Sequence, residues 1–180
     1  MNSNNRSLYR FLITAVGVYI CWYIFYDLWM LEDGRLDNWL TEQVAVASGY
    51  SLKIFGYEGA VKNTTVYIAS HPMVFVGNGC NGLILMALFL GFVVAFPGPI
   101  LRKLMYIPVG IVVINFLNVM RVVALALTAL YQPDLLDFNH KYTFTFVVYA
   151  CIFGLLMLWV KRFSSLADIQ LESKPTADVA

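Results

Sequence analysis

Residues 106–131 read YIPVGIVVINFLNVMRVVALALTALY, and this stretch determines the fold class of the chain. A helix needs about 20 mostly apolar residues to cross the hydrocarbon core of a bilayer, and Arg121 is the only charged residue here. Tyr106 and Tyr131 stand at the two ends, where membrane interfaces favour aromatic rings. The stretch therefore predicts a transmembrane helix over about residues 106–130.

The composition of the whole chain supports the same fold class. Of its 180 residues, 60% are hydrophobic and 13% are charged, whereas soluble domains are roughly 45–50% apolar and about 25% charged. We predict an all-α integral membrane protein that forms a single membrane domain over residues 1–180. A net charge of +1 gives no reason to expect a nucleic-acid partner. Three cysteines without a CxxC pair and two histidines form no zinc-binding pattern, and we expect neither a metal nor an organic cofactor.

Three further apolar stretches predict spans over about residues 11–31, 81–97 and 142–160. The first lacks a signal-peptide cleavage pattern, so we expect it to be retained. Basic residues in short loops set the orientation of a membrane protein. With four spans, three basic pairs fall on one side of the membrane: Arg6 and Arg10, Arg102 and Lys103, Lys161 and Arg162. We therefore predict a multi-pass protein of the plasma (inner) membrane with both termini, including the polar tail 163–180, in the cytoplasm.

The extracytoplasmic side then receives residues 32–79 and a short loop, 131–141. Apolar residues at helical spacing predict an amphipathic helix over residues 36–52 that lies along the membrane surface. Residues 59–76 are rich in β-branched and aromatic residues, with breaks at 62–64 and 70–72. This pattern predicts a small β-hairpin that leads toward Cys80.

Cys80 lies in the hexapeptide Gly77-Asn78-Gly79-Cys80-Asn81-Gly82, at the start of the predicted second span. A cysteine that serves packing is usually surrounded by apolar neighbours. The flanking glycines instead permit unusual backbone angles and let another chain approach closely, which suits a cysteine that must be reached. Cys21 and Cys151 stand mid-span among apolar residues, and we predict that they fill the core.

Arg121 is the charged residue that the membrane alone does not explain. Ionisable groups within spans are expensive and indicate function or specific pairing. Asn118 and Asn115 precede it at intervals of three residues, so the three polar side chains share one helix face. This face must meet a protein interior or a wet cavity. Polar contacts between helices and a functional site both remain open as explanations.

Two histidines are candidates for the position beside Cys80. His140 precedes the fourth predicted span, and His71 lies in the Ser70-His71-Pro72 break. A thiolate nucleophile needs a neighbouring base or cation. Histidine can take the thiol proton and later protonate a leaving amine, whereas arginine can stabilise a thiolate or an oxyanion. Cys80, His140 and Arg121 thus form a complete set for acyl transfer on a peptide bond, with His71 as the alternative base.

The chain resembles the exosortase/archaeosortase family over roughly residues 75–162. Five segments carry the resemblance: 79–83 (GCNGL), 96–99 (FPGP), 107–110 (IPVG), 118–122 (NVMRV), and His140 before the last span. The resemblance implies Cys80 as the nucleophile, Arg121 as the essential arginine and His140 as the third catalytic residue, with Asn118 and Asn81 in support. Asn81 stands where the family usually has serine. Many exosortases have about twice as many spans, so this chain resembles a compact four-span member with room for a partner membrane protein.

By this resemblance, the chain is expected to be a membrane-embedded cysteine protease or transpeptidase with its active site at the extracytoplasmic face. Its expected substrate is the C-terminal sorting tail of a surface or secreted protein, which comprises a short motif, a transmembrane helix and a basic end. The tail would be cleaved through an acyl-enzyme. The alternative is a non-catalytic membrane assembly factor for surface-protein or polysaccharide export. A transporter is disfavoured because no internal repeat occurs, and a redox protein because Cys80 has no resolving partner.

Overall fold

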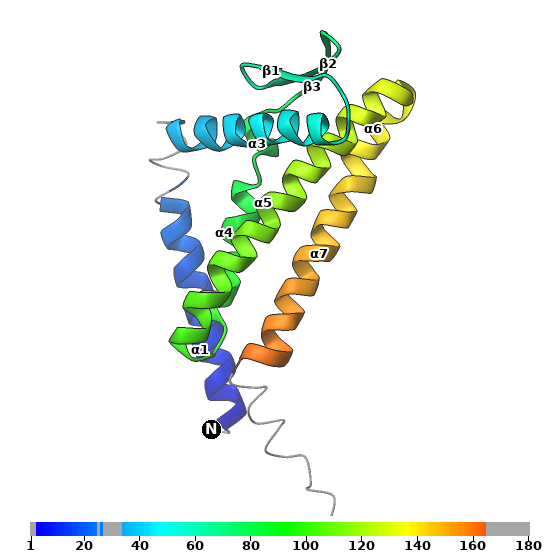
Figure 1. Ribbon diagram of the computed structural model, residues 1–180. Coiled ribbons are helices and arrows are strands. Elements are labelled where there is room, and N and C mark those ends of the chain that lie inside the picture. The colour runs from blue at the N-terminus through cyan, green and yellow to red at the C-terminus, as the bar shows by residue number, and fades with distance from the viewer. Residues whose placement is uncertain (1–2, 25, 27–33, 165–180) are drawn as a thin grey trace, which may run out of the picture.

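The computed structural model describes residues 3–24, 26 and 34–164. Four helices stand side by side in a bundle, as Figure 1 shows: α1 (Ser3–Trp22), α4 (Leu83–Ala95), α5 (Ile100–Tyr131) and α7 (Phe144–Leu158). Helix α3 (Arg35–Ile54) runs across one end of this bundle, and a small sheet lies beyond it. We call this end of the molecule the Cys80 end, and we call the opposite end, where α7 finishes, the Trp159 end.

Within the described residues, two helical stretches are long and apolar enough to cross a membrane, at 100–131 and 133–163. The apolar helical segments 12–22 and 83–95 are shorter. At 1.5 Å per residue, the 13 residues of α4 rise only about 20 Å. The predicted four helices are present, but four complete spans stay a prediction. The predicted end of the first span, at 27–31, and nearly all of the predicted tail lie outside the described residues.

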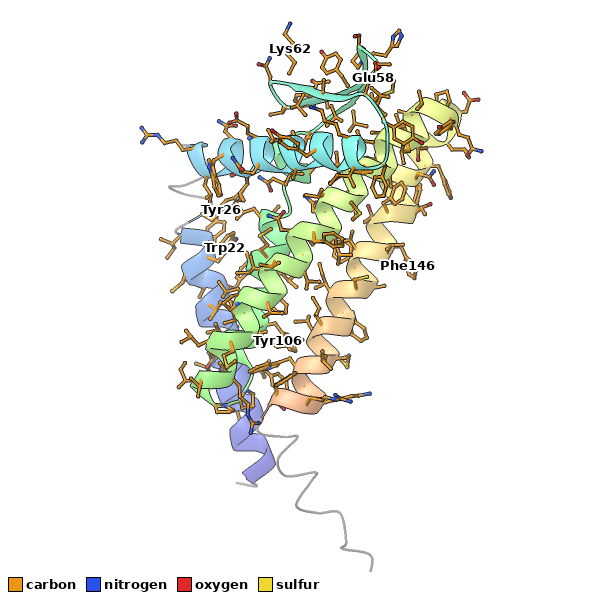
Figure 2. The ribbon with its side chains drawn as sticks, viewed as in Figure 1. Trp22, Tyr26, Glu58, Lys62, Tyr106 and Phe146 are labelled. Carbon is orange, nitrogen blue, oxygen red and sulfur yellow. The ribbon has the colours of Figure 1, made fainter. Side chains whose placement is uncertain are left out.

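The arrangement of the helix ends bears on the predicted topology. Helix α1 begins at the Trp159 end, where α5 also begins and α7 finishes (Figure 1). The three basic pairs therefore belong to one end of the bundle. Figure 2 shows Lys62 at the end of β1 and Glu58 just before this strand, both at the other end, with Phe146 pointing away from α7. The orientation of these ends with respect to the cytoplasm stays a prediction.

The β-prone segment forms three antiparallel strands, where the sequence predicted a hairpin. They are β1 (Gly59–Lys62), β2 (Thr65–Ile68) and β3 (His71–Phe75), in the order β1-β2-β3. The first predicted break contains the turn at 63–64. The second turn is at 69–70, so His71 and Pro72 of the predicted break 70–72 belong to β3. Asn63 adopts a φ of 55° in the first and Ser70 a φ of 67° in the second, a region that turns use. The second break therefore reverses the chain once more and adds the strand that leads to Cys80.

Helix α3 confirms the amphipathic helix predicted over residues 36–52 and extends it by one or two residues at each end. Its buried face packs against the sheet and α5. The approach to β1 is close, because a Cβ atom on Gly59 would lie 2.6 Å from the carbonyl oxygen of Gly49. A larger residue at either glycine would push the sheet away from α3.

Two large apolar clusters, and a small one of Tyr26, Leu40 and Leu83, hold the described part of the chain together. At the Cys80 end, α3, the sheet and the second half of α5 share one cluster: Val44, Ala45, Leu52, Val66, Ile68, Val76, Val119, Val122, Val123 and Ala126. Toward the Trp159 end, α4, α5 and α7 share the other: Met86, Phe89, Val93, Tyr106, Ile114, Val148, Ile152 and Trp159.

Two sequence predictions were wrong. The predicted loop 131–141 is mostly helical, because η3 (Pro133–Leu135), α6 (Leu136–Phe138) and the π-helical turn η4 (Asn139–Thr143) lead directly into α7. Cys21 was predicted to fill the core, but it is exposed on α1, while Cys151 is half-buried on α7. Apolar neighbours in sequence do not distinguish a helix face that meets lipid from one that meets protein, because both environments are apolar.

Candidate active site

Cys80 ends the short 3-10 helix η2 (Asn78–Cys80), between the sheet and α4. Its backbone N–H donates to the carbonyl of Gly77 at 2.8 Å, which fixes the turn. Gly82, which starts α4, has a φ of +79°, so the hexapeptide does use a glycine where other residues are strained. Cys80 is half-buried and packs against the apolar cluster of the Cys80 end, and its access to a substrate stays a prediction.

His140 is the histidine that lies beside Cys80. The Cys80 Sγ and His140 Nε2 atoms are 3.6 Å apart, within hydrogen-bond range for sulfur. His71 is exposed at the first position of β3. The structure thus resolves the choice that the sequence left open. It also places His140 in the helical turn η4, where its backbone carbonyl accepts a hydrogen bond from Thr145 Oγ1 at 3.0 Å.

Arg121 shares a cavity of about 200 Å³ with Cys80 and His140. Its Nε atom is buried and, among the described residues, has no hydrogen-bond partner. The guanidinium keeps its charge at any physiological pH and offers five N–H donors in a planar fork. Arg121 as a whole is half-buried, and Asp137 is the acidic residue that lines the same cavity. Within this cavity the Arg121 guanidinium can meet an oxygen of a ligand. The predicted convergence of these three side chains is therefore what the structure shows.

Asn118 supports Cys80 from α5. Its Nδ2 donates to the backbone carbonyl of Cys80 at 2.7 Å, and its side chain is almost fully buried. The same helix presents Arg121 one turn later, so α5 contributes both a contact to the Cys80 turn and the cation. Gly82 lies against Asn118 as well, since a Cβ atom there would come 3.5 Å from the Asn118 side chain. Two of the three residues of the predicted polar face, Asn118 and Arg121, thus lie at the Cys80 turn.

Asp37 is the residue of this site that the sequence did not single out. Its carboxylate is buried, accepts a hydrogen bond from Asn81 Nδ2 at 2.6 Å and another from Tyr26 Oη at 2.8 Å. Asn81 in turn accepts the backbone N–H of Leu83 at 2.9 Å, which satisfies a free donor in the first turn of α4. The side chain after Cys80 is therefore fixed from α3.

A second contact from α3 holds the residue two positions before Cys80. Thr41 Oγ1 lies 3.2 Å from Asn78 Oδ1, and Asn78 Nδ2 donates to Asn38 at 3.4 Å. With Asp37 on one side of Cys80 and Thr41 on the other, α3 contacts both flanks of the Cys80 turn. This explains in physical terms how a helix lying across the bundle can contribute to the site.

The geometry defines what the site can do. A thiol beside an imidazole can be deprotonated by it, and a guanidinium in the same cavity can stabilise an oxyanion. Within the described residues, no group of three or more histidine, cysteine or acidic side chains could hold a metal ion. The arrangement matches the requirements of cysteine-dependent acyl transfer.

Comparison with known proteins identifies the family of this chain. The family model described as transmembrane exosortase (Exosortase_EpsH) matches residues 4–159. The chain therefore belongs to the transmembrane exosortase family and is a membrane protein, as its sequence predicted. Neither a curated protein nor a solved structure matched the chain.

Proposed function

We propose that this chain is a membrane-embedded cysteine protease or transpeptidase that cleaves the C-terminal sorting tails of surface or secreted proteins through an acyl-enzyme. The family membership supports the general role. The single observation that carries the specific chemistry is the 3.6 Å approach of Cys80 Sγ to His140 Nε2 in the cavity shared with Arg121. A nucleophile and base in contact, with a cation beside them, form the minimal set for this reaction.

Acylation begins when His140 takes the proton from Cys80 Sγ and the thiolate attacks the carbonyl carbon of the scissile peptide bond. The carbonyl oxygen becomes an oxyanion, which the Arg121 guanidinium stabilises by charge and by its N–H donors. The C–N bond then breaks. His140 returns the proton to the leaving amine, which departs with the transmembrane part of the tail. The surface protein is left joined to Cys80 as a thioester.

Deacylation uses the same groups in reverse. His140 takes a proton from the incoming nucleophile, which is water for a protease or the amine or hydroxyl of an anchoring acceptor for a transpeptidase. This nucleophile attacks the thioester, and the Cys80 thiolate leaves and regains the proton. We place this chemistry at the extracytoplasmic face of the plasma membrane. The predicted topology and the expected transmembrane helix of the tail are the basis for that placement.

The direct test is co-expression with a tail-bearing surface protein from the same genome. Gel mobility and intact mass report whether the tail is lost. We expect loss with the wild type and none with Cys80→Ser, while Cys151→Ser, the matched control, retains activity. Equal processing by wild type and Cys80→Ser of a confirmed cognate substrate would contradict the proposal. A non-catalytic assembly factor would then be favoured.

A second pair of variants separates the two histidines. His140→Gln removes the base beside Cys80 and should lower the processing rate by about 10²–10⁴-fold, the usual contribution of general acid–base catalysis. His71→Gln changes an exposed residue on β3 and should remain near the wild-type rate. If His140→Gln and His71→Gln lower the processing rate by the same factor, His140 is not the base. Processing rates should be measured at matched membrane levels of each protein.

A further inference from the structure

Strand β3 is the last strand of the sheet, and its far edge pairs with no other strand among the described residues. Hydrogen-bonded and non-hydrogen-bonded residue pairs alternate along an antiparallel ladder. The Val76 N–H donates to Thr64 at 2.9 Å, so the neighbouring pair of Phe75 and Thr65 is of the non-hydrogen-bonded kind. The N–H and C=O groups of Phe75 therefore point away from β2, toward the free edge.

The cavity that holds Cys80 runs along this edge. Its walls include four consecutive residues, Met73, Val74, Phe75 and Val76. Successive side chains of a strand point to opposite faces, so a cavity over one face would be lined by alternate residues only. A lining of four residues in a row indicates that the cavity meets the strand from the side. There its backbone groups are available.

We propose that this edge of β3 binds the sorting motif of the substrate as an added β-strand, with Phe75 as the pairing residue. This inference rests on the proposed function and specifies how the substrate is held. Extended peptides commonly bind proteins by adding a strand to a free edge, where main-chain bonds supply affinity and pockets supply selectivity. Phe75 lies five residues before Cys80, so a peptide paired there extends toward the thiol.

The features of β3 suit this use of its edge. Pro72 and the extra residue Met73, which has no partner in the register with β2, lie at the end away from Cys80. Proline and bulges protect sheet edges from indiscriminate pairing. Alternate residues direct their backbone groups toward the same edge, so the next candidate after Phe75 is Gly77. The carbonyl of Gly77 already accepts the Cys80 N–H. Phe75 is thus the residue nearest to Cys80 whose N–H and C=O are both available for a guest strand.

The opposite wall of the cavity predicts which side chain accompanies the strand. Val122 and Leu125 of α5 and Leu136 of α6 line it together with the catalytic groups. Its volume of about 200 Å³ has room for an apolar side chain. We infer that a residue of the sorting motif next to the scissile bond is apolar and enters this space.

Photo-crosslinking tests strand addition independently of turnover. A photoreactive benzoylphenylalanine replaces Phe75 in a Cys80→Ala background, and the tail-bearing protein is co-expressed. The matched control places the same group at Lys62, an exposed residue of β1 at the other edge of the sheet. We expect a cross-link to the sorting motif from position 75 and none from position 62. Cross-linking from both positions alike, or from position 62 alone, would overturn the inference.

A backbone variant provides the complementary measurement. Phe75→Pro removes the N–H that points to the free edge, whereas Phe75→Ala keeps it. We expect Phe75→Pro to raise the KM for a sorting-tail peptide at least tenfold. The KM of Phe75→Ala should be several-fold lower than that of Phe75→Pro and closer to the wild-type value. Equal KM values for the two variants would contradict strand pairing. If the wild type cleaves the tail but position 75 gives no cross-link, strand addition is wrong while the proposed function stands. If the wild type does not cleave it, the proposed function itself fails for that substrate.

Discussion

The two ends of the molecule bury different kinds of side chain. At the Cys80 end the buried residues include Asp37, Thr41, Asn81 and Asn118, each within hydrogen-bond range of the Cys80 turn or of a residue that contacts it. At the Trp159 end the buried residues are mainly large and apolar, and aromatic rings pack together there: Phe89, Tyr106, Trp159 and Phe163. Apolar packing tolerates small losses one contact at a time, whereas a buried polar network fails when one partner is removed.

This difference indicates that the two ends of the molecule have different roles. The aromatic cluster ties α4, α5 and α7 into a rigid support. The polar network holds Cys80 and Arg121 in positions that an apolar core would not favour, and this arrangement lowers the stability of the fold. Substitutions at the Cys80 end should therefore affect catalysis first, and those at the Trp159 end should affect stability alone.

The largest effect among the tests of this comparison is expected for Arg121→Lys. A lysine keeps the charge but loses the planar fork of donors, and it does not reproduce the geometry of an arginine contact. We expect processing to fall by about 10²–10³-fold, the range for loss of one oxyanion contact. Arg102→Lys, at the other end of α5, is the matched control and should have little effect. Full activity of Arg121→Lys would remove the guanidinium from oxyanion stabilisation.

The sequence predicts a feature of this structure well when the residues that determine the feature are near one another in the chain. Hydrophobic length predicted 81–97 and 142–160, and the helices found are Leu83–Ala95 and Phe144–Leu158. Spacing by three residues on one helix predicted that Asn118 and Arg121 share a face. These inferences succeed because each depends on residues that are near one another in the chain.

The remaining features of the site depend on tertiary contacts. Asp37 and Asn81 are 44 residues apart, and nothing in the sequence around Asp37 distinguishes it from the exposed acidic residues of the same segment. His140 and His71 were equivalent in sequence because their distances to Cys80 follow from the packing of α7 and of β3. A break near Ser70 was predicted, but the third strand was not, because it depends on the pairing of the chain after this break with β2.

Asp37→Asn tests whether the polar network positions the nucleophile. The substitution removes the charge that strengthens the bonds from Asn81 and Tyr26, and it turns an amide N–H₂ toward one of these donors. We expect a loss of about 1–3 kcal/mol in stability, measured by thermal unfolding in detergent, together with slower processing. Glu42→Gln changes an exposed acidic residue of the same helix and serves as the control.

Stability and catalysis can be separated in the Asp37 experiment. If Asp37 only stabilises the fold, the protein that remains folded should have the wild-type kcat. If Asp37 positions the Cys80 turn, kcat per folded molecule should fall while KM changes little. An unchanged kcat in Asp37→Asn would confine this residue to a structural role and weaken the contrast drawn between the two ends.

The smallest effect is expected for Tyr106→Phe at the Trp159 end. The Tyr106 hydroxyl donates to the backbone carbonyl of Leu155 at 2.8 Å, but that carbonyl also accepts the backbone N–H of Trp159. Removal of the hydroxyl therefore leaves no buried acceptor without a partner, and the ring still fills its place in the aromatic cluster. We expect about 0.5–1.5 kcal/mol of lost stability and no change in kcat, with exposed Tyr142→Phe as the control. A fall in kcat for Tyr106→Phe would mean that the aromatic cluster influences the geometry at Cys80 along the length of α5, and the separation between support and site would then be wrong.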